Sequence, residues 1–238
     1  MKKISSVLFI LLILGCYSPT IHAQFAIVKD SIRGETPALE RLKGNTNPRI
    51  NILNNSVVYM YPRNADIEPW RYVDYFKSGG NSERVYIHSN FLVNVDNFEI
   101  IESERLSSHG SISFKNDSIR VAISLSNISP NDKSLKIGQG GKFFINGRQT
   151  YGANNTLPRF GYQSIVVTLK GKRYILPKEQ INFLFAPSLI DTTVYYDHDS
   201  GIVYIMANNG EADNTYHVLW TIDKKGQSNV FVKSWNIL

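Results

Sequence analysis

Turn-forming residues interrupt this chain at short and regular intervals, and this spacing limits what the chain can fold into. Clusters of Asn, Asp, Gly and Pro recur roughly every 8 to 12 residues, which is typical of β-sandwiches and barrels. The segments between them are rich in β-branched and aromatic residues, with 13 Tyr and 12 Phe in the chain. Long stretches with the 3.6-residue period of an amphipathic helix are absent. The sequence therefore predicts an all-β fold.

The clearest strand pair covers residues 70–75 and 85–87, with a Gly-Gly-Asn turn at residues 79–81 and a short helical turn expected over residues 88–92. The second strand reads Val-Tyr-Ile-His-Ser from residue 85. This pattern resembles the last hairpin of bacterial SH3-like (SH3b) domains, where an aromatic-rich strand is followed by a Gly-Tyr-Ile-His-Ser-type strand. Val85 stands where that family commonly has Gly. The resemblance implies a small binding barrel in an exported protein.

We expect three parts in the chain: a signal peptide at residues 1–23, an SH3b-like barrel at 24–106 and a β-rich domain at 107–238. The last part contains strict apolar alternation at residues 119–125 and one predicted helix over residues 178–185, between Pro177 and Pro187. It resembles a companion domain that follows the SH3b module in Bacteroidetes proteins. No activity attaches to that companion. The expected architecture is thus an N-terminal SH3-like small barrel followed by a β-rich second domain with one short helix.

The first residues predict export. A basic start, Met-Lys-Lys, precedes an apolar run over residues 7–15 that is too short to cross a bilayer. Cleavage after Ala23 and lipidation at Cys16, within a lipobox-like Leu-Gly-Cys, both remain open. Either route places the protein in the periplasm, outer membrane or cell surface of a Gram-negative bacterium. A membrane contact is expected only through the lipid anchor.

Cysteine and charge exclude several classes of function. Cys16 is the only cysteine, so the exported chain has no disulfide, thiol nucleophile or Cys-ligated metal. The formal net charge is +6, of which Lys2 and Lys3 of the leader contribute two. No run of five basic residues occurs, and nucleic acid is not an expected partner.

The aromatic side chains of the first module are the candidate binding residues. Alternation places Trp70 and Tyr72 on one face of their strand and Val73 and Tyr75 on the other. Because a small barrel has one interior, one aromatic set must lie near the surface. Exposed Tyr and Trp offer a large contact area with few rotatable bonds. The predicted platform comprises Tyr59, Tyr61, Trp70, Tyr72 and Tyr86. The alternative is that these rings cap the ends of the barrel or pack against the second module.

Acidic and histidine residues give weaker indications of a metal-binding or catalytic site. Asp197-x-Asp199-x-Gly201 has oxygen ligands at alternate positions but lacks a third acid and a distal Glu, so a hairpin loop explains it better than calcium. Glu211 and Asp213 lie in the next loop and could join this pair. His88, His109, His198 and His217 show no HExxH spacing, and no GxSxG surrounds Ser89. We therefore expect no catalytic residues, no metal and no cofactor.

These observations favour a non-enzymatic envelope protein whose barrel binds a peptide, glycan or protein partner. The first alternative is a cell-wall-directed hydrolase, which requires converging carboxylates, for example from Asp197, Asp199, Glu211 and Asp213. The second alternative is a structural assembly component, which requires a large exposed apolar patch. The identity of the ligand and the oligomeric state stay open at this point.

Overall fold

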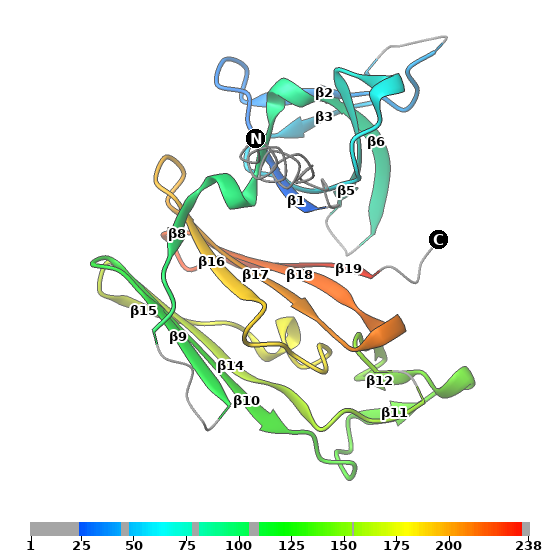
Figure 1. The fold of residues 1–238 in the computed structure, drawn as a ribbon, viewed down its shortest axis with the longest axis vertical. Coiled ribbons are helices and arrows are strands. Elements are labelled where there is room, and N and C mark those ends of the chain that lie inside the picture. Colours follow the sequence, from blue (N-terminus) through cyan, green and yellow to red (C-terminus); the bar gives the residue numbers. More distant parts are fainter. Residues whose placement is uncertain (1–23, 44–47, 78–80, 105–109, 154, 235–238) are drawn as a thin grey trace, which may run out of the picture.

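The computed structural model describes residues 24–43, 48–77, 81–104, 110–153 and 155–234, and every structural statement below concerns these ranges (Figure 1). The described chain is all-β, as predicted. The predicted signal peptide, Cys16 and His109 lie outside the described residues. Within the described residues, no helix has the length and apolar character needed to cross a membrane.

The first module is a curled five-stranded antiparallel sheet in the order β6-β5-β4-β1-β7, with a separate β2-β3 hairpin. A bridge between Leu39 and Tyr86 links the end of this hairpin to β6, so the strands wrap around one small core (Figure 1). The elements are β1 (Gln24–Val28), β2 (Glu35–Ala38), β3 (Ile50–Leu53), β4 (Val57–Met60), η1 (Ala65–Ile67), β5 (Trp70–Phe76), β6 (Ser82–His88), η2 (Ser89–Phe91), β7 (Leu92–Asn94) and η3 (Val95–Asn97).

The second module contains three further antiparallel sheets. Their orders are β19-β18-β17-β16-β8, β15-β14-β10-β9 and β11-β12-β13. The elements are β8 (Glu99–Ile101), β9 (Ser111–Lys115), β10 (Ile119–Asn127), β11 (Leu135–Ile137), η4 (Gln139–Gly141), β12 (Phe143–Ile145), β13 (Arg148–Gln149), β14 (Phe160–Leu169), β15 (Lys172–Ile175), η5 (Lys178–Gln180), β16 (Thr192–Asp197), β17 (Ile202–Asn209), η6 (Ala212–Asn214), β18 (Tyr216–Ile222) and β19 (Ser228–Ser234).

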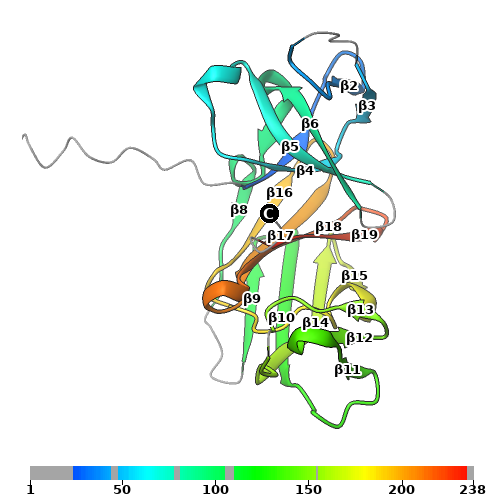
Figure 2. The same ribbon diagram turned by 90° about the vertical axis from the view of Figure 1, so that its right-hand side faces the viewer.

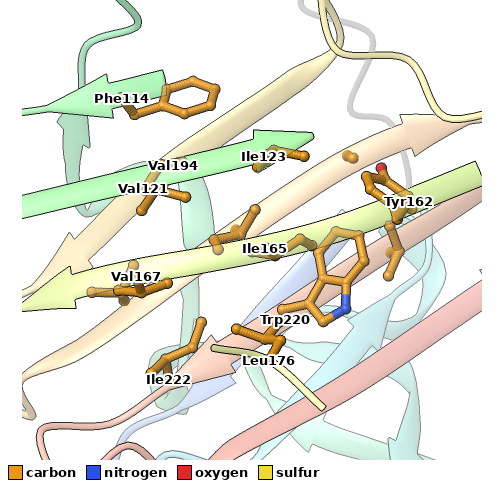
Figure 3. Close-up of a cluster of buried hydrophobic side chains, with 14 of the residues drawn as sticks. Phe114, Val121, Ile123, Tyr162, Ile165, Val167, Leu176, Val194, Trp220 and Ile222 are labelled. Carbon is orange, nitrogen blue, oxygen red and sulfur yellow. The ribbon is translucent and has the colours of Figure 1, made fainter. Parts of the chain in front are cut away.

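The β16–β19 sheet is the middle of three layers (Figures 1 and 2). One face, with Val218, Trp220 and Ile222, packs on the β9–β10–β14–β15 sheet and forms the largest core (Figure 3). The opposite face, with Tyr204 and Leu219, packs on the first module. Because both faces are covered, the strands are near-continuous apolar runs rather than alternating ones.

Strands β1 and β4 of the first module show the same double burial. Ala26 and Val58 point into the small core of the barrel, whereas Phe25, Ile27 and Tyr59 point toward the middle sheet. All four residues of β4 are buried. The two modules therefore share one apolar interface instead of being joined only by a linker. Strand β8, at residues 99–101, already pairs with β16 of the second module.

Two tight hairpin turns form at Gly-containing dipeptides, whereas the predicted helix does not form over its full length. Asn146 and Gly147 both have positive φ, at 50° and 81°, and Lys170 and Gly171 do likewise, at 49° and 80°. This geometry suits two-residue hairpins, because it matches the twist of the flanking strands. The predicted helix over residues 178–185 is wrong in extent: a single 3-10 turn, η5, is followed by a bridge from Leu184 to Tyr151. The apolar side chains of this segment are held by core packing and this bridge.

Shortening a buried side chain of the middle layer should destabilise the whole protein. We expect Leu219→Ala, at a side chain with 0% exposure, to lower the free energy of unfolding by about 2–5 kcal/mol, since it leaves a cavity between the modules. The matched variant Ile175→Ala, on a strand of the outer sheet with 57% exposure, should cost less than about 0.5 kcal/mol. Urea unfolding of both variants checks this. Equal effects would contradict the layer assignment.

Candidate functional site

Three neighbouring strands of the first module place their aromatic side chains in register. Tyr72 on β5 lies directly opposite Tyr86 on β6, and Trp70 lies opposite His88. On the other side of β5, the backbone N–H of Tyr61 donates to the carbonyl of Tyr72 at 3.1 Å. Residues directly opposite on adjacent strands project to the same face. Their side chains therefore lie together on the outer face of the sheet.

The rings contact one another in two groups, one of Tyr61, Tyr72 and Tyr86 and one of Trp70 and His88. Ring centroids are 5.5 Å apart for Tyr61 and Tyr72, 4.9 Å for Tyr72 and Tyr86, and 5.5 Å for Trp70 and His88. All five side chains are partly exposed. We call Tyr61, Trp70, Tyr72, Tyr86 and His88 the aromatic row. It contains four of the five predicted platform residues and adds His88, which was not among the predicted platform residues.

Tyr59 is the exception, and its prediction as part of an exposed platform is wrong. Its side chain is 1% exposed and packs edge-on against Phe25 at a centroid distance of 5.2 Å. Its hydroxyl lies 3.4 Å from Nδ1 of His217 in the second module. Burial raises the pKa of the Tyr59 hydroxyl, and the nearby Tyr61 and Asp74 raise it further. Tyr59 is therefore part of the interface between modules, the alternative considered for these aromatics.

A buried ion pair borders the aromatic row. The Asp74 carboxylate, 1% exposed, accepts hydrogen bonds from Lys233 Nζ at 2.5 Å and from the Tyr61 hydroxyl at 2.8 Å. Lys233 Nζ also donates to the Tyr61 oxygen at 3.0 Å. The guanidinium of Arg84 lies 3.4 Å from the second Asp74 oxygen. Since Lys233 comes from β19, the second module helps to fix the position of Tyr61.

The groups around Lys233 favour its charged form. Burial alone would lower the pKa of Lys233, but the hydrogen bonds to Asp74 and Tyr61 raise it above its usual value. The pKa of Arg84 is also raised, first by Tyr61, over whose ring its guanidinium lies at 5.9 Å. A cation beside the row thus stays charged at any physiological pH. Neither Asp74 nor Lys233 was singled out from sequence, because only the folded chain brings β5 and β19 together.

The Asp197–Gly201 segment is a hairpin loop. Asp197 Oδ1 accepts from the backbone N–H groups of Asp199 and Ser200, and Oδ2 accepts from the Ser200 hydroxyl at 2.6 Å and from Lys29 Nζ at 2.5 Å. Burial would raise the Asp197 pKa, but the bonds from Lys29 and Ser200 outweigh burial and lower it. This carboxylate stabilises its own turn and a contact between the modules, which is the turn interpretation preferred from sequence.

The acids proposed for a hydrolytic site do not converge. Asp197 and Asp199 lie at one end of β17, and Glu211 and Asp213 lie beyond its other end. The eight residues of β17 separate them by about 25 Å at roughly 3.3 Å per residue. Among the described residues, no group of three or more His, Cys, Asp or Glu side chains could hold a metal ion.

Comparisons with family models, with curated proteins and with solved structures gave no match.

The pair formed by Asp74 and Lys233 should matter for stability. We expect Asp74→Ala to cost about 3–5 kcal/mol, because it leaves a largely buried ammonium without its carboxylate. The double variant Asp74→Ala, Lys233→Met should recover part of this loss. As a control, Glu68→Ala at the exposed pair with Arg63 should cost less than about 1 kcal/mol. Urea unfolding measures all three, and a neutral Asp74→Ala would refute the pair.

Asp197 should contribute to acid sensitivity. Its pKa is lower in the folded than in the unfolded state, so its stabilisation is complete above about pH 4 and is lost as the pH falls through the folded pKa. We therefore expect the unfolding free energy of the wild type to fall more steeply between about pH 4 and 2 than that of Asp197→Asn. Asp199→Asn, whose side chain makes no hydrogen bond within the described part, should retain the wild-type slope. Identical slopes for all three proteins would contradict this assignment.

Proposed function

We propose that this protein is an exported, non-enzymatic binding protein of the bacterial cell envelope. An SH3b-like N-terminal module binds a peptide, glycan or protein partner on the aromatic row. The observation that carries the proposal is the uneven covering of one sheet face. The middle sheet covers Phe25, Ile27 and Tyr59, whereas the aromatic row on the same face stays partly exposed.

The uncovered rings suit a binding surface better than a stability role. A Tyr or Trp side chain gains most from burial, and each can bury about 150–250 Å². Here the rings contact one another in tilted pairs and keep part of that area available to solvent. A ligand ring or apolar side chain that stacks on the row would bury it. This supports a site that is completed by a partner.

The polar groups beside the aromatic row can orient a bound ligand. Arg84 lies beside the row on β6, and the ion pair of Asp74 with Lys233 holds the Tyr61 hydroxyl. Charged and hydroxyl groups next to an apolar platform can hydrogen-bond a ligand that the rings hold by contact. A site of this kind discriminates ligands by their polar groups and requires no bond-breaking chemistry.

The alternatives receive less support. The hydrolase hypothesis required carboxylates from two loops that lie at opposite ends of β17. The assembly hypothesis required one large apolar patch, and the exposed large apolar side chains come from seven separate segments of the described chain.

Binding should depend on the rings of the aromatic row and not on exposed aromatic side chains elsewhere in the protein. Glycan fragments and soluble proteins from a cell-envelope extract are offered separately to the immobilised protein. We expect Tyr72→Ala and Trp70→Ala to weaken retention by about tenfold, which corresponds to about 1.4 kcal/mol. Phe160→Ala, at a 39% exposed aromatic on the second module, is the matched control and should bind as the wild type does.

The two fractions identify the class of ligand, since retention of glycan fragments and of a protein are separate outcomes. Circular dichroism establishes that each variant is folded. If folded Trp70→Ala and Tyr72→Ala retain the same material as strongly as the wild type, the aromatic row is not the binding site.

A further inference from the structure

Strand β19 is an edge strand of the middle sheet, and no other strand of the described residues pairs with its outer side. Its seven residues pair with β18 without a register shift and contain no proline. Exposed edges of this length usually carry a bulge, a proline or charged side chains that prevent pairing with another chain. Among the edge strands of the described chain only β6 is as long, and its edge already bonds with Leu39. Within the described chain, β19 is therefore the long edge strand whose outer side is available for pairing with another strand.

The register identifies which backbone groups point outward. The N–H of Asp223 donates to the carbonyl of Gln227, so alternation along the antiparallel pair directs residues 229, 231 and 233 toward β18. The backbone groups of Val230 and Val232 then point away from β18. The carbonyl of Ser228, on the same outward side, accepts from the side chain of Gln180 at 2.8 Å, which supports this assignment.

This edge lies in a groove between the modules with a cavity volume of about 1000 Å³. Figure 2 shows β19 running between the strands of the first module and the β12–β13 hairpin. One wall, from the first module, presents Asn54, Asn55 and Asn81. The other wall, from the second module, presents Arg148, Gln149 and Gln180. The edge of β19 therefore lies between two walls that are rich in amide side chains.

The charged residues of the groove favour a ligand with acidic side chains. The Arg148 guanidinium lies 3.3 Å from the ring centroid of Phe183 and donates to the carbonyl of Glu179 at 3.1 Å. No carboxylate of the described residues pairs with it. Lys77 is already paired with Glu83, and Asp223 accepts from the N–H groups of its own turn. Arg148 is held in place and ready to bind a carboxylate.

We propose that the edge of β19 binds an extended, acidic peptide segment of a partner protein. The peptide adds to the middle sheet as a further strand and pairs with the backbone groups of Val230 and Val232. Its side chains point alternately to the two walls, as in any strand. Those on one side contact the amides of the first module, and those on the other side place a carboxylate against Arg148. This site is separate from the aromatic row.

The probe is a capped heptapeptide, Thr-Val-Thr-Glu-Thr-Val-Thr, titrated into the protein while amide exchange is followed by NMR. At a peptide concentration ten times the Kd, we expect exchange at Val230 and Val232 to slow by about tenfold. Asn229 and Phe231, already bonded to β18, should change little. A peptide with Lys in place of Glu should bind about tenfold more weakly.

Two comparisons separate backbone pairing from general adhesion. The same peptide with every backbone nitrogen methylated keeps its side chains but has no N–H donors, and it should not protect Val230 or Val232. Arg148→Ala should weaken binding of the Glu peptide by about tenfold, whereas Arg173→Ala on the exposed strand β15 should not. If neither peptide protects these two amides, or if the methylated peptide protects them equally, the proposal is wrong.

Discussion

Burial of the β16–β19 sheet on both faces is the constraint on which the rest of the structure depends. Leu219 and Trp220 are neighbours in sequence, yet one packs on the first module and the other on the outer sheet, and both are 0% exposed. A strand with this pattern has no face that can be left in water. The first module is therefore a required covering layer for the second and not an independent attachment.

Two ion pairs fix how the first module sits on this sheet. Lys29 of the first module reaches Asp197 of the second near one end of the interface, and Lys233 of the second reaches Asp74 of the first near the other. Buried pairs of this kind add little net stability but disfavour shifted arrangements, in which each charge would lie unpaired. The resulting position leaves part of the β4–β5–β6 face uncovered and holds the first module above the edge of β19. The aromatic row and the groove are both consequences of this position.

Local patterns predicted much of the fold and less of the site. The strands at residues 70–75 and 119–125 were predicted because alternation, apolar runs and turn residues are properties of neighbouring positions. The short strands β2 and β13 have no such pattern and were missed. The helix predicted over residues 178–185 was wrong because the flanking prolines suit a 3-10 turn as well as a helix. Its apolar residues serve the core without helical periodicity.

For the site, alternation placed Trp70 and Tyr72 together on a partly exposed face, but it could not separate Tyr61 from Tyr59. Both point to the same side of the β4 segment, and only the position of the second module decides that Tyr59 is covered. Asp74 and Lys233 are 159 positions apart, so no spacing rule could join them. The sheet order that leaves β19 at an edge is likewise a property of the assembled fold.

Native-state amide exchange in low concentrations of denaturant tests the central claim most directly. It compares the opening free energy of Ile87, in the core of the first module, with that of Trp220, in the middle sheet. If the middle sheet requires its covering layer, both amides open in one event with the same free energy and the same dependence on denaturant. Opening of Trp220 that leaves Ile87 protected, or the reverse, would show that the modules are independent and contradict the account.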